Sequence, residues 1–229
     1  MGGRAGGGVP GRPAPLGPEG FRAATDVSRE TLARLKRYAA LLEKWNRAIN
    51  LVGRDSLADL WRRHMLDSAQ LLPLLPPPPA GRPRVVLDLG SGAGFPGLVL
   101  AVLGAGEVHL VECDRKKAAF LREAAAAAEA EIAIHNERIE RLPPFPADVV
   151  TARALAPLPR LLDYAAPFLR PGERGSGGVA IFPIGRGVDR ELTDSVQKWK
   201  MRAEVFSSRS DPAAKIVRLS RLAREENRP

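Results

Sequence analysis

The chain has 229 residues, 45% of them hydrophobic and 27% charged, which is the composition of a globular protein of one domain with a short extension at most. No run of about 18 apolar residues occurs, so we expect no membrane-spanning helix, and without a secretory signal we expect a cytoplasmic location. The net charge is +9, while one cysteine and three scattered histidines exclude an internal disulfide and predict no metal site.

The N-terminal third is expected to be a tail followed by helices. Residues 1–24 are rich in glycine and proline and predict a disordered tail. Residues 25–75 predict a helical extension with two helices, over residues 28–48 with Ser28 as N-cap and over residues 57–72 with Asp55 or Ser56 as N-cap. Four prolines at positions 76–79 then break the chain before a new unit.

Residues 80–222 alternate apolar runs with helical patterns, which predicts an α/β domain with a mostly parallel, doubly wound sheet covered on both faces. The expected strands cover residues 84–88, 107–112, 132–135, 147–152, 179–183, 204–207 and 216–219. The expected helices cover residues 97–103, 115–130, 158–168 and 188–200.

The residues that carry chemistry follow the first of these strands. The chain reads Asp88-Leu-Gly90-Ser-Gly92-Ala-Gly94-Phe-Pro-Gly97 and then enters a helix, which is the context of a nucleotide-binding glycine loop. Glycines allow a tight turn and let a ligand lie against the backbone. Glu112 comes 22 residues after Gly90, at the end of the next strand, where its carboxylate can accept both hydroxyls of a ribose.

Two ligands fit such a loop. Gly92, Gly94 and Gly97 match the dinucleotide pattern G-x-G-x-x-G, which would suit a nicotinamide-dependent oxidoreductase. A negative charge at Asp88 is unfavourable beside a pyrophosphate, but it is favourable beside a ligand with a cationic amino-acid tail and no phosphate. S-adenosylmethionine is such a ligand, and the arrangement resembles the first motif of the Rossmann-like class I methyltransferases. We therefore predict S-adenosylmethionine as the cofactor.

Further segments make the resemblance more specific. They are Trp45-Asn46 with Asn50-Leu51, Arg63-His64 with Leu66-Asp67-Ser68, Leu110-Val111-Glu112, Arg138-Ile139-Glu140, Thr151-Ala-Arg153-Ala154 and Ser208-Arg209-Ser210-Asp211. Over residues 41–220 the chain resembles the bacterial small-subunit ribosomal RNA methyltransferase G family, also called glucose-inhibited division protein B. The resemblance implies an enzyme that methylates N7 of a guanine in the decoding-region loop of small-subunit (16S) ribosomal RNA, with that RNA or the ribosomal subunit as partner.

The resemblance also implies roles for residues of the cofactor pocket. Gly90 and Phe95 would line it, Ile139 and Glu140 would hold the adenine, and Arg153 would lie at its open mouth. Together with Asp88, Gly92, Gly94 and Glu112 they complete the expected cofactor site. This placement fits the rule that ligands bind outside the carboxyl ends of parallel strands.

The implied chemistry needs little from side chains. Guanine N7 carries an in-plane lone pair and no proton, so it can attack a sulfonium methyl group directly. The enzyme has to align the reacting atoms at short range. We therefore predict no catalytic side chain and no general base.

The distribution of charge favours a polyanionic partner. Residues 28–75 carry nine basic and five acidic side chains, residues 198–229 carry nine and four, and residues 76–197 carry fourteen and fifteen. A GC-rich genome explains part of the arginine excess, but charge concentrated in the flanks favours nucleic acid. The RNA-binding candidates are Arg62, Arg63, His64, Arg153, Arg160, Arg186, Arg209, Lys215 and Arg218.

Other residues are interpreted as structural. Asp67 and Ser68 suit a local hydrogen-bond network, Trp61 suits core packing, and Cys113 is expected to be a small buried residue. One departure from the family concerns substrate binding, because Ile184 stands where the family usually has a lysine. Arg186, two residues later, is the expected substitute.

Three alternatives remain open on the sequence. The chain could be a class I methyltransferase acting on another RNA, a protein or a small molecule, an NAD-dependent oxidoreductase, or an RNA-binding module without catalysis. A monomer is expected, because no coiled-coil pattern or unexplained apolar stripe is present.

Overall fold

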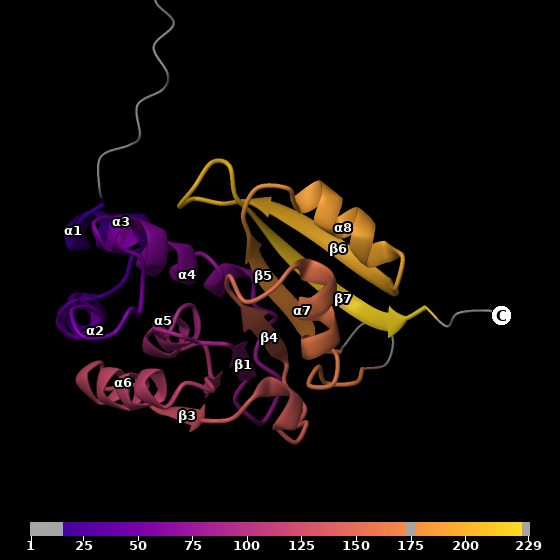
Figure 1. The fold of residues 1–229 in the computed structure, drawn as a ribbon, viewed down its shortest axis with the longest axis horizontal. Helices are drawn as coiled ribbons and strands as arrows, with labels where there is room; N and C mark the ends of the chain where they lie inside the picture. The colour runs from indigo at the N-terminus through magenta and orange to yellow at the C-terminus, as the bar shows by residue number, and fades with distance from the viewer. Residues whose placement is uncertain (1–15, 173–176, 226–229) are drawn as a thin grey trace, which may run out of the picture.

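The computed structural model describes residues 16–172 and 177–225, which fold around one seven-stranded sheet (Figure 1). The strands are β1 (Val85–Leu89), β2 (Glu107–Val111), β3 (Ile132–His135), β4 (Val149–Ala152), β5 (Val179–Ile184), β6 (Trp199–Ser207) and β7 (Lys215–Arg224). Their order is β3-β2-β1-β4-β5-β7-β6, with the first five strands parallel and β7 antiparallel to both neighbours. The predicted mostly parallel, doubly wound α/β fold is confirmed.

Helices precede the sheet and connect its strands. They are α1 (Pro18–Thr25), α2 (Arg29–Asn46), α3 (Arg54–Leu57), the π-helix η1 (Trp61–Leu66), α4 (Asp67–Ala69), η2 (Leu72–Leu74), α5 (Gly97–Val102), α6 (Arg115–Ala127), η3 (Ile139–Arg141), α7 (Leu158–Ala165) and α8 (Val188–Val196). The side chain of Ser28 accepts a hydrogen bond from the backbone N–H of Thr31, so the predicted N-cap of α2 is confirmed.

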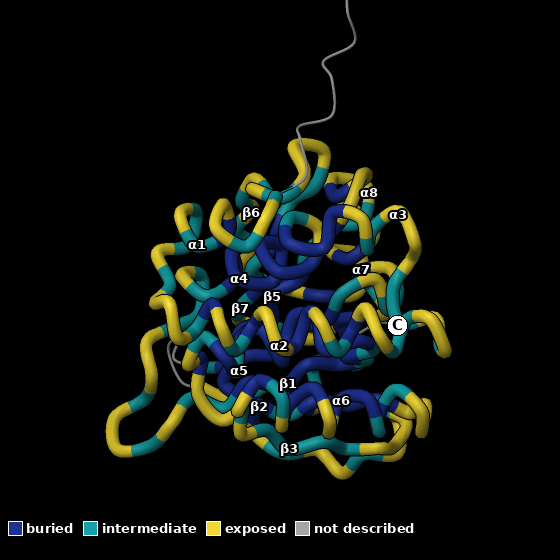
Figure 2. The backbone as a smooth tube through the Cα atoms, turned by 90° about the vertical axis from the view of Figure 1, so that its left-hand side faces the viewer, coloured by how far each residue is buried: buried dark blue, intermediate teal, exposed yellow. Residues whose placement is uncertain are grey.

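The sheet separates two apolar cores. Alternate residues of β1 face opposite sides, with Val86 in the core under α2, α5 and α6 and Leu87 in the core under α7 and α8. Both faces are covered, so the central strands are apolar along nearly their whole length. Figure 2 shows this pattern, with buried backbone in the centre and exposed turns outside.

The N-terminal segment differs from the expected disordered tail. Residues 18–24 of the expected tail lie in α1, and residues 1–15 lie outside the described residues. Phe21 is fully buried, and its ring lies 5.4 Å from that of Trp61. The helical extension is therefore part of the first core rather than a separate unit, because the two share one cluster of buried residues.

The second expected helix, over residues 57–72, is broken into α3, η1, α4 and η2, and Gly53 rather than Asp55 or Ser56 precedes it. Leu60, Trp61, Met65 and Leu66 are all buried in the first core, and the residues from His64 to Leu71 are buried without interruption. The segment therefore has no single apolar face of α-helical period that would keep it in one regular helix.

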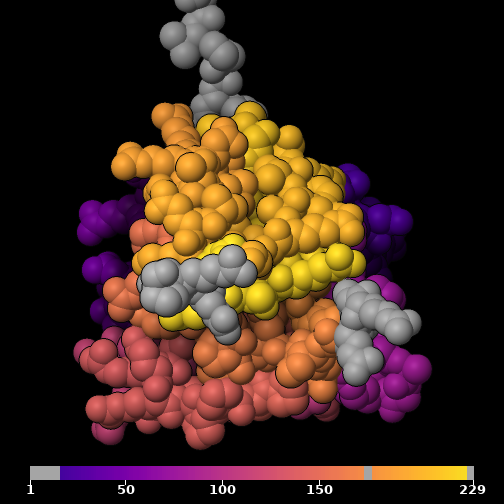
Figure 3. Space-filling model, turned by 90° about the vertical axis from the view of Figure 1, so that its right-hand side faces the viewer, coloured from indigo at the N-terminus to yellow at the C-terminus, as the bar shows by residue number. Residues whose placement is uncertain are grey.

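The C-terminal strands are longer than predicted. The helix expected over residues 188–200 ends at Val196, and β6 begins at Trp199, because Trp199 and Met201 alternate with the exposed Lys200 and Arg202 in the manner of a strand. Figure 3 shows α8 and the β6–β7 pair together forming one side of the molecule.

We predict that Phe21→Ala lowers the free energy of unfolding by about 3–5 kcal/mol, because it removes a fully buried ring from a packed core. Urea denaturation measures this effect. Ala23→Ser, at an exposed position of the same helix, is the control and should change stability by less than about 0.5 kcal/mol. Equal stability of the two variants would show that α1 does not belong to the core.

Candidate functional site

The glycine loop joins β1 to α5 at the carboxyl end of the sheet. Gly90, Gly92 and Gly94 have φ angles of +67°, +56° and +94°, which side chains other than glycine rarely adopt. The loop is fixed from within, since the backbone N–H of Ser91 donates to the carbonyl of Val111 at 2.9 Å. A methyl group on Gly94 would lie 2.9 Å from the hydroxyl of Tyr38, so this glycine also allows α2 to approach the loop.

Asp88 supports the loop from inside the protein. Its side chain is fully buried, and Oδ2 accepts a hydrogen bond from the backbone N–H of Gly97 at 3.0 Å. Its other oxygen, Oδ1, has no hydrogen-bond partner among the described residues. Burial raises the pKa of Asp88 to about 7. Asp88 therefore lies behind the loop, where it fixes the start of α5.

Glu112 fixes the opposite side of the loop. Its Oε2 accepts a hydrogen bond from the backbone N–H of Gly92 at 2.9 Å, and its Oε1 accepts one from the N–H of Asp114 at 2.8 Å. The residue is buried at the end of β2. A carboxylate thus lies at the position from which the sequence predicts ribose recognition.

A cleft of about 390 Å³ opens over these residues. Six of the nine predicted cofactor residues line it, namely Gly90, Gly92, Glu112, Ile139, Glu140 and Arg153. The other three, Asp88, Gly94 and Phe95, lie behind its wall and are buried or nearly so. The cleft lies outside the carboxyl ends of the strands, where ligands of this fold class bind.

Sequence reasoning missed or misplaced other residues of this cleft. Cys113 was expected to be buried, but it is exposed and lines the cleft, because the chain leaves the sheet directly after Glu112. Tyr164 also lines it, and its hydroxyl donates to Oε1 of Glu140 at 3.0 Å. Hydrogen bonds to its carboxylate keep the pKa of Glu140 below its usual value. The position of Tyr164 on α7 carries no motif that would have indicated this contact.

Arg153 joins the end of β4 to the helical extension. Its Nη1 donates to the carbonyl of Arg63 at 2.9 Å and lies 3.4 Å from Oδ2 of Asp67, while its Nη2 lies 2.5 Å from Nδ1 of His64. The guanidinium lies 5.0 Å from the centre of the Phe95 ring, on which His64 also stacks. Because an arginine only donates, Nδ1 of His64 accepts and the neutral ring carries its proton on Nε2.

His64 therefore supplies no positive charge to RNA at neutral pH. Burial first, then the charges of Arg153 and Arg63, lower the pKa of His64 to about 3. A contact of His64 with RNA, which stays a prediction, would therefore be one of a neutral ring. Asp67 and Ser68 are buried in a local hydrogen-bond network, as predicted, in which Asp67 accepts from Gln70 and Ser210.

A second cleft, of about 440 Å³, adjoins the first. Arg153 and Ala154 line both clefts and form their common wall. The second cleft is also lined by Arg63, His64, Asp67, Ile184, Glu191 and Asp211. It is formed between the helical extension, the ends of β4 and β5, and the turn between β6 and β7.

The remaining RNA-binding candidates fall into two groups. Arg63, Arg160, Arg186 and Arg209 have exposed side chains, and Lys215 is partly exposed. Arg62 and Arg218 are largely occupied within the fold, because Arg62 pairs with Asp59 at 3.6 Å and Arg218 binds Glu204 and the carbonyl of Leu74. The count of basic residues in the flanks therefore overstates the charge that can face a polyanion.

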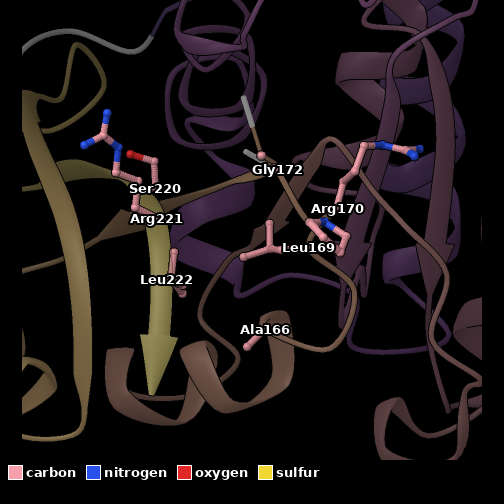
Figure 4. A pocket seen from close by; sticks show the side chains of 10 residues that line it. Ala166, Leu169, Arg170, Gly172, Ser220, Arg221 and Leu222 are labelled. Atoms are coloured by element: carbon pink, nitrogen blue, oxygen red, sulfur yellow. The ribbon is translucent and has the colours of Figure 1, made fainter. Parts of the chain in front are cut away.

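A further cleft lies away from these two. It has about 680 Å³ and lies near the amino ends of β4 and β5, between the loop after α7 and β7, where Figure 4 shows Leu169, Ser220 and Leu222 around it. Two arginines line it, Arg170 and Arg221, and Arg170 is paired with Asp148 at 2.8 Å. Within the described ranges no group of His, Cys, Asp and Glu side chains is placed to hold a metal ion, and no helix is long and apolar enough to cross a membrane.

Comparisons with known proteins agree with this geometry. The family model described as rRNA small subunit methyltransferase G matches residues 31–176. A protein of that name from Rhodospirillum rubrum is 58% identical over 207 residues, which cover 90% of this chain and 98% of the relative. Its counterpart from Paramagnetospirillum magneticum is 52% identical and covers 93% of this chain and 100% of the relative.

Solved structures of methyltransferases share the fold. An O-methyltransferase from Bacillus cereus in complex with SAH has a TM-score of 0.53 at 14% identity, covering 81% of this chain and 91% of its own. A magnesium protoporphyrin IX methyltransferase from Synechocystis PCC 6803 with bound SAM has a TM-score of 0.52 at 15% identity, covering 85% and 98%. At these identities the likeness concerns the fold alone.

We predict that His64→Gln makes the stability of the protein less dependent on pH. As the pH falls from 6.5 towards 3, the unfolded chain binds a proton at His64 that the folded protein does not, so stability is lost on acidification. Glutamine still offers Arg153 an acceptor but does not titrate. Between about pH 6 and about pH 4, the free energy of unfolding measured by urea denaturation should fall more steeply for the wild-type protein than for the variant. The difference should reach up to about 1.4 kcal/mol per pH unit. Equal slopes would mean that His64 is protonated in the folded state.

Proposed function

The chain belongs to the rRNA small subunit methyltransferase G family, and from this premise we propose that it methylates N7 of a guanine in small-subunit ribosomal RNA. It is an S-adenosylmethionine-dependent methyltransferase with a class I fold. The observation that carries the proposal is the pair of clefts that meet at Arg153, one of them built on the glycine loop. Such a pair suits a cofactor and an acceptor that must touch at one point.

The residues of the first cleft fit S-adenosylmethionine. The carboxylate of Glu112 lies beside Gly92, where it can accept the ribose hydroxyls, and Ile139 offers an apolar side chain to the adenine. Asp88 places a buried carboxyl group, with one oxygen unpartnered among the described residues, behind the loop on the side expected for the cationic amino-acid tail. When bound, the cofactor supplies an electrophilic methyl group on a positively charged sulfur.

The proposed acceptor atom explains why the site contains no obvious base. Guanine N7 has a lone pair in the ring plane and no proton to lose, so no side chain has to remove one. Among the described residues at the common wall, His64 and Asp67 are ordinary candidates for a base, and both contact the guanidinium of Arg153. The protein contributes by holding both ligands in line, which is a contribution of proximity and orientation.

RNA binding is assigned to the exposed arginines around the second cleft. Arg63 lines the cleft itself, and Arg186 follows directly after Gly185, which also lines it. This neighbourhood supports Arg186 as the source of the positive charge that Ile184 lacks. Binding through phosphate contacts should weaken steeply as salt rises. We place the enzyme in the cytoplasm, with its ribosomal substrate.

The alternative of an NAD-dependent oxidoreductase fits the site less well. In the dinucleotide pattern the pyrophosphate lies at the amino end of the helix that follows the glycines, which here is the start of α5. The first backbone N–H of α5, that of Gly97, already donates to Asp88. A buried carboxyl group at this helix end disfavours a phosphate there.

The direct test is methyl transfer from labelled S-adenosylmethionine to small subunits that lack the modification and to their naked ribosomal RNA. We expect one 7-methylguanosine, identified by mapping the labelled nucleotide. Transfer to another atom or another class of RNA would contradict the proposal. Faster transfer to the subunit or to the naked RNA would identify which of the two is the substrate of the enzyme.

The cofactor site is tested by Glu112→Gln, which removes the charge and one acceptor oxygen. We expect the affinity for S-adenosylhomocysteine, measured by calorimetry, to fall by about 10- to 100-fold, as for loss of a hydrogen bond to a charged group. Glu107→Gln, at the exposed start of the same strand, is the matched control and should bind normally. Normal binding by Glu112→Gln would remove Glu112 from the site.

A further inference from the structure

The second cleft contains features that a cofactor does not explain. We propose that it receives the target guanine as a base turned out of the RNA stack, and that the carboxylate of Asp211 recognises the N1–H and the 2-amino group of that base. This inference rests on the proposed function, because it specifies how the acceptor of that reaction is bound. It assigns a specificity-determining role to a residue in the turn between β6 and β7.

The position of the cleft restricts what it can bind. It meets the cofactor cleft at Arg153 and Ala154, so a reacting atom has to lie at this wall. A purine that places N7 there enters the second cleft with its opposite edge leading away from the wall. A base stacked within an RNA helix cannot adopt this position, so the nucleotide has to be extruded.

The sides of the cleft suit a flat aromatic ring. Ile184, which is 6% exposed, lines it together with Pro183, Ala156 and Leu161. These apolar side chains can pack against the faces of a purine, in the way that flipped bases are held between apolar groups. Ile184 in place of the lysine usual in the family thus gives an apolar contact at a position where charge was expected.

Three carboxylates line the cleft, and two of them are already occupied. Oδ1 of Asp67 accepts from Gln70 and from Ser210, and Oδ2 lies near Arg153. Oε2 of Glu191 accepts the backbone N–H of Leu158 at 2.7 Å and so caps the start of α7. Asp211 is exposed, and Oδ1 of its carboxylate accepts a hydrogen bond from the backbone N–H of Ala213. Asp211 is therefore the carboxylate most available to a ligand.

The distance across the sheet fits this assignment. β4, which carries the common wall, is separated from β7 by β5, so the β6–β7 turn lies two strand spacings away, about 10 Å. A purine that extends from the wall, with a hydrogen bond at its far end, spans a gap of this size. Asp67 contacts Arg153 on one side and Ser210 of this turn on the other, so both of its oxygens are occupied between the wall and the turn.

The turn that carries Asp211 is held in place by the helical extension. The backbone N–H of Arg209 donates to Oε1 of Gln70 at 2.7 Å, and the hydroxyl of Ser210 donates to Asp67 at 2.5 Å. These bonds precede Asp211 directly and restrict its position. A carboxylate fixed at this point accepts from the two donors of guanine but opposes N1 of adenine, which is an acceptor.

A second observation also indicates a ligand. His64 lines the cleft and is 7% exposed, and its Nε2, which carries the proton, has no hydrogen-bond partner in the described part of the chain. A buried donor without a partner is costly. Because Nε2 is buried, the 6-oxo group of guanine, which lies next to N7 at the edge that faces the wall, can accept from it only if the side chains around His64 move when the base enters. The 6-amino group of adenine cannot accept at all.

The test uses inosine, which keeps N1–H, N7 and the 6-oxo group but lacks the 2-amino group. Methyl transfer is measured on reconstituted small subunits that carry guanosine or inosine at the mapped target position. The proteins are the wild type, Asp211→Asn and, as matched control, Asp194→Asn, an exposed position of α8 outside the cleft. Affinity for S-adenosylhomocysteine and thermal unfolding of all three verify that the fold and the cofactor site are intact.

We expect inosine to lower kcat/KM by about 10-fold or more for the wild type and for Asp194→Asn, because it removes one hydrogen bond to a charged acceptor. For Asp211→Asn the two substrates should differ by about 2-fold or less, since the recognising carboxylate is gone. An undiminished inosine penalty in Asp211→Asn would overturn the assignment. A wild-type protein that does not modify guanine N7 would instead overturn the proposed function, and this inference with it.

Discussion

The guanidinium of Arg153 reaches from the end of β4 to a carbonyl, a carboxylate and a ring nitrogen of the segment that contains Arg63, His64 and Asp67. The side chain of Arg153 is 18% exposed and that of Asp67 is 13% exposed. Two partly buried charges that lose water are stable only while both remain and their hydrogen bonds are complete. The two clefts share the side chain of Arg153. The relative position of cofactor and acceptor therefore depends on all of its contacts, to the carbonyl of Arg63, to Asp67 and to His64.

Several arginines in and around the helical extension make hydrogen bonds within the protein. Arg34 donates to the carbonyls of Ala128 and Glu129, and Arg37 donates to that of Ala127, at the end of α6 where the helix dipole favours cations. Arg209 likewise donates to the carbonyl of Ala24. Arginines that seem available for RNA in a count of charges thus hold the N-terminal helices on the sheet. The part of the surface left for phosphate is smaller and lies near the second cleft.

The sequence predicts local features of this site well and distant ones poorly. The glycine loop and Glu112 follow from strand ends and glycine spacing, and both lie where predicted. The sequence predicts Asp88 at the cofactor site but not the direction of its side chain, because strand residues alternate between faces, and this side chain points with Val86 beneath α5, behind the loop. The contact of Arg153 with His64 joins residues 89 positions apart, and no local periodicity encodes it. For the same reason the burial that makes His64 neutral could not be predicted from its basic neighbours.

The π turn at η1 makes the length of this segment as important as its composition. Each residue of an ordinary helix rotates the side chains that follow by about 100°. A π turn holds one residue more than an α turn, so deleting one residue between Trp61 and Leu66 would leave an α-helical turn with Asp67 and Gln70 still directed towards Arg153 and the β6–β7 turn. An inserted residue has no such compensation, because the turn is already wide, and it would rotate these side chains away. Related chains that keep both clefts should therefore be able to lack one residue between these two buried positions, but not to carry an additional one.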